Sequence, residues 1–164
     1  MMAYEIIKEF GQPGAILTVR SMLLAILLIG LTGTGVELLL LNHVESLWQW
    51  VPVLLILLSF VVLGWHGVKR GPVGIRAIQC TMIAFIAAGF TGFYFHYQGS
   101  VEFKLESNPS LSGWTLFWEA VRSKAPPALA PGVMIELGLI GLAYTYRHPA
   151  LFASARTESK DKGE

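Results

Sequence analysis

The 164-residue chain contains few charged residues and a single cysteine. Only 14% of its residues are charged and 54% are hydrophobic, whereas about a quarter of the residues in a soluble domain are charged. Cys80 has no partner for an internal disulfide, which excludes thiol redox chemistry within the chain. The formal net charge of +1 and the dispersed basic residues argue against nucleic acid as a partner. The composition therefore predicts an integral membrane protein.

Four apolar stretches are long enough to cross a membrane, which takes about 20 mostly apolar residues in a helix. The first stretch is longer than the core of a signal peptide, so we interpret it as a retained anchor. Short connections make consecutive helices antiparallel neighbours. The predicted fold is therefore all-α, an up-down four-helix transmembrane bundle forming one domain over residues 1–150, with a polar tail at 151–164. The predicted spans are residues 22–41, 47–68, 77–97 and 129–146.

Lysine and arginine residues are unevenly distributed between the two ends of these spans. Because cytoplasmic loops are enriched in Lys and Arg, the richer end is expected to face the cytoplasm together with both termini. The expected location is a bacterial cytoplasmic (inner) membrane. The residues at the cytoplasmic end are Lys8, Arg20, Lys69, Arg70, Arg76, Arg147, Arg156, Lys160 and Lys162, and those at the outer end are Lys104, Arg122 and Lys124.

The longest connection, residues 98–127, is predicted to be an outer loop that acts as a lid. Its segment 101–106 alternates apolar and polar residues, which predicts a short strand. A short amphipathic helix, lying on the outer leaflet or across the mouth of the bundle, is predicted by the i, i+3, i+4, i+7 spacing of Trp114, Phe117, Trp118 and Val121. Close packing of another helix against the third span is predicted by small residues at every fourth position, Cys80, Ala84, Ala88 and Gly92.

Two carboxylates inside the predicted spans are candidate functional groups, because an ionisable residue there costs at least about 2.5 kcal/mol on insertion scales. Glu37 lies four residues before Leu41 and Glu136 lies four residues after Gly132, so the two side chains could face each other at one depth near the outer side. The alternative is that both are protonated or hydrogen-bonded within the bundle. With nearby side chains they form a set that could bind a divalent metal or a proton at the outer face, Glu37, Glu136, His43, His96, Glu45 and Glu102, although no pair has a diagnostic ligand spacing.

The four histidines fall at the ends of the predicted helices, two on each side of the membrane. His43 and His96 end the first and third spans on the outer side. His66 and His148 end the second and fourth on the inner side. This arrangement resembles membrane b-type cytochromes, in which two histidines from different helices ligate haem. These residues are therefore candidate ligands for haem b or, singly, for a chlorophyll-type pigment, and the alternative is unliganded interfacial histidine.

Sequence motifs give no support for nucleophilic catalysis, since no serine elbow and no Cys-His or Ser-His-Asp arrangement is present. The leading interpretation is a small non-enzymatic membrane subunit or accessory factor of a larger membrane complex. Small size, smooth helix faces and the aromatic outer segment favour it. The alternatives are a tetrapyrrole-binding electron-transfer or pigment subunit, and the outer-face metal or proton site. Expected partners are other membrane proteins, lipid and a second copy of the chain.

Overall fold

The computed structural model describes residues 13–41, 47–122 and 129–152. Within these ranges the ordered elements are all helices and no strand occurs, so the all-α prediction is confirmed. The site candidates His43 and Glu45, and nearly all of the predicted polar tail, lie outside the described residues. The helices are α2 (Pro13–Leu40), α3 (Leu47–Lys69), α4 (Pro72–Ser107), α5 (Gly113–Val121) and α6 (Leu129–Thr145).

Three of these helices, α2 from Gly14 onward, α3 and α4, are long and apolar enough to cross a membrane. This finding supports an integral membrane protein. Helix α6 is also apolar, but its 17 residues extend only about 26 Å at 1.5 Å per residue, which is shorter than about 30 Å of hydrocarbon. A fourth span, and with it the complete four-helix bundle, therefore stays a prediction.

The observed helix ends differ most from the predicted ones at α4. This helix begins at Pro72 and runs without interruption to Ser107, ten residues beyond the predicted end of the span. The strand predicted for residues 101–106 is therefore wrong. Once a helix has formed, each added residue gains a backbone hydrogen bond at little cost, whereas a single strand has no neighbour with which to pair. The short helix predicted from the spacing of Trp114, Phe117, Trp118 and Val121 is present as α5.

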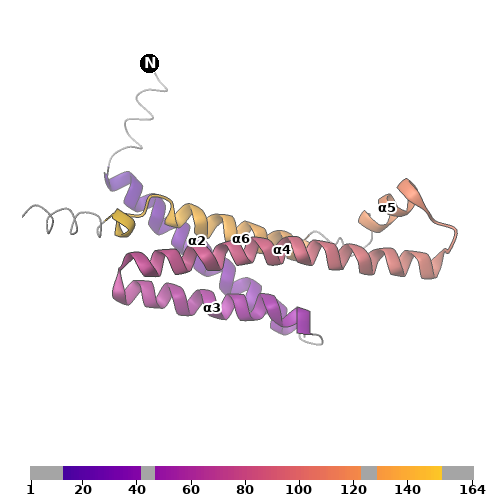
Figure 1. Cartoon of the computed structure of the whole chain (residues 1–164), viewed down its shortest axis with the longest axis horizontal. Coiled ribbons are helices and arrows are strands. Elements are labelled where there is room, and N and C mark those ends of the chain that lie inside the picture. The colour runs from indigo at the N-terminus through magenta and orange to yellow at the C-terminus, as the bar shows by residue number, and fades with distance from the viewer. Residues whose placement is uncertain (1–12, 42–46, 123–128, 153–164) are drawn as a thin grey trace, which may run out of the picture.

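Helix α4 is the centre of the arrangement, with α3 and α6 packed along it (Figure 1). Helix α2 packs mainly on α6 and only lightly on α3. Figure 1 shows α5 folded back on the far part of α4, beyond the ends of the other long helices, rather than across them as the predicted lid would lie. The largest fully buried side chains between the helices include Leu27, Leu31, Ile75, Ile78, Met82 and Phe85.

Glycines allow the backbones of α4 and α6 to approach closely in an antiparallel contact. A β-carbon built at Gly138 would lie 2.7 Å from the carbonyl oxygen of Met82. A β-carbon built at Gly89 would lie 2.8 Å from the carbonyl oxygen of Pro131. Small residues at helix contacts allow this approach in membranes. The predicted small-residue stripe is therefore only partly correct, because Cys80 is exposed and Gly89 makes the closest approach on α4.

Candidate functional site

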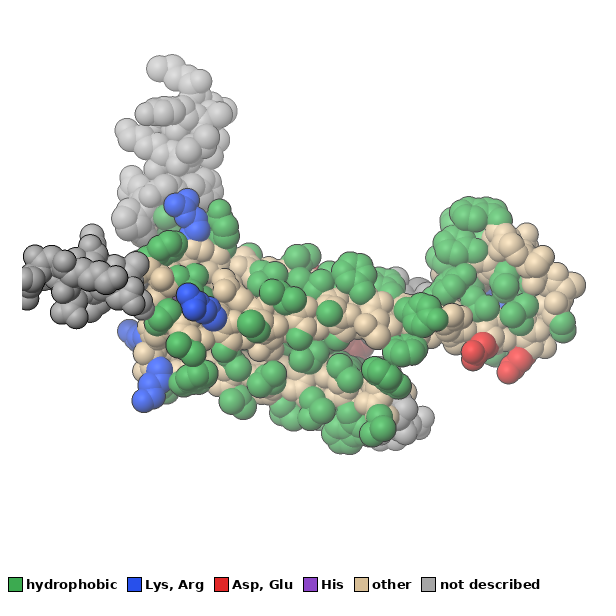
Figure 2. Space-filling view, in the orientation of Figure 1, with side chains coloured by type: hydrophobic (Ala, Val, Ile, Leu, Met, Phe, Trp, Pro, Cys, Tyr) green, Lys and Arg blue, Asp and Glu red, His purple; other side chains and the backbone are tan. Residues whose placement is uncertain are grey.

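Charge is separated between the two ends of the long helices. One end, here called the cationic end, comprises the turn between α3 and α4, the beginning of α2 and the segment after α6, and its described residues include no carboxylate (Figure 2). Its positive charges are Arg20, Lys69, Arg70, Arg76 and Arg147. The carboxylates of the described residues lie farther along the helices or beyond them, at Glu37, Glu102, Glu106, Glu119 and Glu136.

Two of the predicted candidate residues, His66 and His148, come together at the cationic end. Their ring centroids lie 5.2 Å apart in an edge-to-face arrangement. His66 is only 6% exposed, and within the described residues its buried Nδ1 atom has no hydrogen-bond partner. Gly74 at the start of α4 makes room for this ring, because a β-carbon there would lie 2.9 Å from His66 Nδ1. The close turn between α3 and α4 therefore fixes the position of His66.

His148 follows α6 in a turn that sets its protonation state. The backbone N–H of Ala150 donates a hydrogen bond to Nδ1 of His148 at 3.2 Å, so in the neutral ring the proton is on Nε2. Burial lowers the pKa of His148 below its usual value, and the neighbouring Arg20 and His66 lower it further. His148 is therefore held as a neutral imidazole that offers an N–H donor.

Arg20 connects the beginning of α2 to the end of α6. Its Nη2 atom donates hydrogen bonds to the carbonyl oxygens of Tyr146 at 3.0 Å and Arg147 at 2.9 Å. These carbonyls lie where α6 ends, so the guanidinium binds groups that have lost their helical partners. Beside it a shallow groove of about 250 Å³ opens between α2 and α6, lined by Leu17, Arg20, Ser21, Leu24, Tyr144, His148 and Pro149.

The inner histidine pair does not fit haem in this arrangement. Two axial ligands must lie on opposite faces of the macrocycle, whereas the rings of His66 and His148 are in edge-to-face contact with no space between them. His96 is exposed near the other end of α4. Its predicted partner His43 lies outside the described residues. The structure therefore brings together no pair of histidines with the geometry of a haem site among the residues it describes.

The predicted outer metal set is also not assembled in the described part of the chain, where no group of three or more His, Cys, Asp or Glu residues could hold a metal. Glu37, Glu136, His96 and Glu102 are all exposed. Gly30 lies against Leu137 and Leu27 against Gly141, so Glu136 is level with residue 31 or 32 of α2. Glu37 therefore lies about 8 Å farther along the helix, and the two carboxylates are not at one depth.

Comparison of the chain with protein-family models, with curated proteins and with solved structures finds no match. The only regular elements among the residues that the structure describes are helices, and three of these helices are long and apolar enough to cross a membrane. From the sequence, His66 and His148 were placed on the same side of the membrane. Arg20 was used only to assign the orientation, and neither Ser21 nor Tyr144 was proposed as a site residue. An arginine in the first turns of an otherwise apolar helix is the signal that could have indicated Arg20.

Proposed function

We propose that this protein is a small non-enzymatic subunit or accessory factor of a larger membrane complex. It binds its partner through the aromatic hairpin, defined here as residues 98–122, which comprise the end of α4, the following turn and α5. The observation that supports this proposal is the exposed aromatic surface of the hairpin. Trp114 is 73% exposed, and Phe103, Phe117 and Trp118 are also exposed. Exposed groups of large apolar side chains mark sites of interaction with proteins or membranes.

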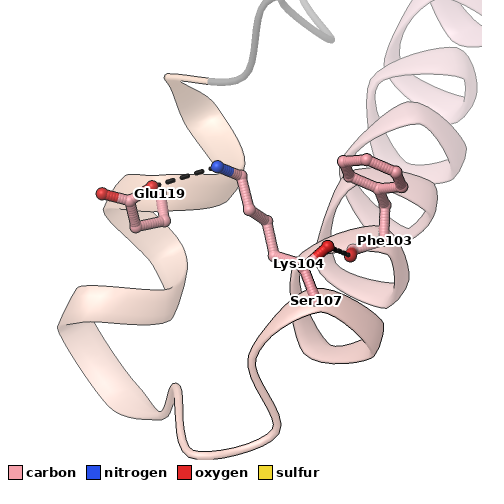
Figure 3. Close-up of polar contacts among 4 residues, drawn as sticks. All are labelled: Phe103, Lys104, Ser107 and Glu119. Atoms are coloured by element: carbon pink, nitrogen blue, oxygen red, sulfur yellow. Dashed lines mark hydrogen bonds and ion pairs between the residues drawn. The ribbon is translucent and has the colours of Figure 1, made fainter.

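The aromatic rings are held in place before any partner binds. Trp114 stacks on Phe117 with centroids 5.0 Å apart and on Trp118 at 6.1 Å. Lys104 of α4 forms an ion pair with Glu119 of α5 at 3.0 Å, which ties α5 to the end of α4 (Figure 3). Arranging the rings in advance reduces the entropy lost on binding, and Trp side chains are enriched among the residues that dominate binding energy.

The length of α4 favours a protein partner over the hydrocarbon of the membrane. Its 36 residues extend about 54 Å, which is about 24 Å more than the hydrocarbon core needs. The residues at the end of α4 include Glu102, Lys104 and Glu106, so this part belongs outside the apolar layer. The aromatic hairpin can therefore reach a domain of a partner protein beyond the membrane surface.

The proposed orientation follows from the charges. The cationic end faces the cytoplasm of a bacterial inner membrane, with both termini on that side, because Lys and Arg accumulate in cytoplasmic loops. In this arrangement α6 is the fourth span, and the aromatic hairpin lies on the outer side. The antiparallel contact of α6 with α4 supports this assignment, since α6 lies alongside a helix long enough to cross.

Cysteine labelling of intact cells tests the orientation. In a Cys80→Ala background, Ser110→Cys in the hairpin turn is expected to react with a membrane-impermeant maleimide from outside. Val68→Cys, at the exposed end of α3, is expected to react only after the membrane is permeabilised. Labelling of Val68→Cys alone in intact cells would indicate the opposite orientation. Equal labelling of both variants would contradict the proposal that the two positions lie on opposite sides of the membrane.

Capture of partners in gentle detergent tests the proposed function. The double substitution Trp114→Ala and Trp118→Ala is expected to lower recovery of the partner by at least about 30-fold, since a central aromatic anchor contributes about 2 kcal/mol or more. The matched control is Trp65→Ala, because Trp65 is 44% exposed and Trp118 46%, but Trp65 lies near the cationic end. Unchanged recovery in the double variant, or capture of the protein alone by the wild type, would contradict the proposal. So would an effect on membrane-surface binding without an effect on the partner.

A further inference from the structure

We infer that the groove between α2 and α6 at the cationic end binds the phosphate of an anionic phospholipid headgroup. The groove combines two kinds of lining that such a molecule requires. Polar groups come from Arg20, Ser21, Tyr144 and His148, whereas Leu17, Leu24 and Pro149 supply apolar surface. This inference concerns the opposite end of the molecule from the aromatic hairpin and does not depend on the proposed function.

Arg20 is the principal ligand. A guanidinium has five N–H donors, and the two hydrogen bonds to Tyr146 and Arg147 both use Nη2. The three donors on Nη1 and Nε are not used in any hydrogen bond that the structure shows among its described residues. Both parallel N–H pairs of a guanidinium include Nη2, so the free donors on Nη1 and Nε bind a phosphate oxygen singly, through charge-assisted hydrogen bonds. The carbonyls that hold Nη2 restrict the guanidinium before the ligand arrives.

His148 supplies a second donor without adding a charge. Because its Nδ1 accepts from Ala150, the neutral ring has its N–H at Nε2. The side chain of Tyr144, which also lines the groove, is buried and lies beside this imidazole with ring centroids 5.9 Å apart. The arrangement thus places one permanent cation and neutral donor groups around one small volume, which suits a headgroup with a single negative charge.

The surroundings favour an anion at this position. Arg20, Lys69, Arg70, Arg76 and Arg147 gather at the cationic end, and the part of the chain described there has no carboxylate to oppose them (Figure 2). Basic pockets between membrane helices bind anionic headgroups by this electrostatic attraction.

The apolar part of the lining distinguishes a lipid from free phosphate. Leu17 is 61% exposed and precedes Arg20 on α2, and Leu24 follows it by one helical turn. A phosphate held at Arg20 therefore has apolar surface along α2 next to it, where the glycerol and the first methylenes of an acyl chain can lie. Free phosphate would make no use of these leucines.

Native mass spectrometry of the full chain in a zwitterionic detergent tests the inference, with phosphatidylglycerol as the anionic probe and phosphatidylcholine as the neutral one. Phosphatidylglycerol is expected to bind more tightly, and Arg20→Gln to weaken it by about fivefold or more, since one Arg near an anionic surface contributes about that factor. The matched control Arg76→Gln removes the same charge at an exposed position outside the groove and is expected to change the affinity by less than about twofold.

Equal weakening by Arg20→Gln and Arg76→Gln would show diffuse attraction rather than a site and would overturn the inference. Equal affinity for the two lipids would also overturn it, as would displacement of the lipid by millimolar inorganic phosphate. A second pair of variants applies if Arg20→Gln does not fold. Leu17→Glu places a negative charge at the mouth of the groove and is expected to weaken phosphatidylglycerol binding, whereas Val19→Glu, exposed on the same helix but outside the groove, is expected to have a smaller effect. Equal effects of this pair would contradict the site.

Discussion

Replacing Gly138 with alanine is expected to lower the free energy of unfolding by about 1 to 3 kcal/mol, the usual cost of forcing extra volume into a packed contact. The added methyl group would meet the carbonyl oxygen of Met82 at 2.7 Å and the backbone nitrogen of Ile86 at 3.3 Å. Backbone atoms of a packed helix cannot move aside as a flexible side chain can, so α4 and α6 must separate. Unfolding in mixed micelles measures the loss.

Gly132→Ala is the matched control, because Gly132 lies on the same helix and a β-carbon there would meet no atom of the other described helices within 4 Å. It is expected to leave stability unchanged or to raise it slightly, since alanine is the better helix former. Gly89→Ala, which would press on Pro131 and Ile135, should resemble Gly138→Ala. Equal stability of Gly138→Ala and Gly132→Ala would show that the two helices are not in close contact.

The helices could be predicted from the sequence wherever local residues determine where a helix begins and ends. The predicted span 47–68 corresponds to helix α3 (Leu47–Lys69), because a mostly apolar run ends at a basic turn. Helix α5 could be predicted from its apolar spacing. The far end of α4 could not, because six alternating residues fit a strand and a helix extension equally well. Contact with α5, through the Lys104–Glu119 ion pair, supports the helical choice and joins residues 15 positions apart.

The candidate site was less predictable because it depends on the rotation and register of the helices. The sequence places His66 and His148 at the same side of the membrane, but their 5.2 Å contact requires that both helices turn these faces toward each other. Counting residues from the apparent ends of spans put Glu37 and Glu136 level. The packing of Gly30 against Leu137 sets a different register between α2 and α6. This register could not be predicted from either helix alone.

His66→Leu is expected to raise the free energy of unfolding by up to about 2 kcal/mol, in the opposite direction to Gly138→Ala. His66 is buried, and within the described residues its Nδ1 atom has no hydrogen-bond partner. A buried polar atom without a partner loses its bond to water on folding and gains none in return, which costs about 1 to 3 kcal/mol. The backbone hydrogen bond of His66 with Gly71, which leucine would lose, offsets about 1 kcal/mol of this cost. Leucine fills similar space beside Gly74 with no polar atom. Unfolding in mixed micelles at neutral pH, with the wild type in parallel, measures the gain.

Ser59→Ala is the control for this prediction, since Ser59 lies two helical turns before His66 on the same buried face of α3. Its hydroxyl donates to the carbonyl oxygen of Leu55 at 2.8 Å, so its polar atom is satisfied and its removal should give no gain. A loss of stability in His66→Leu would mean that the hydrogen bond of His66 with the backbone of Gly71 contributes more than the unpartnered Nδ1 atom costs. A gain would mean that the fold tolerates an unfavourable group beside His148, where burial and Arg20 already favour the neutral imidazole. His66 would then lower the free energy of unfolding, and its presence would be explained by the arrangement of side chains at the cationic end rather than by a contribution to the stability of α3.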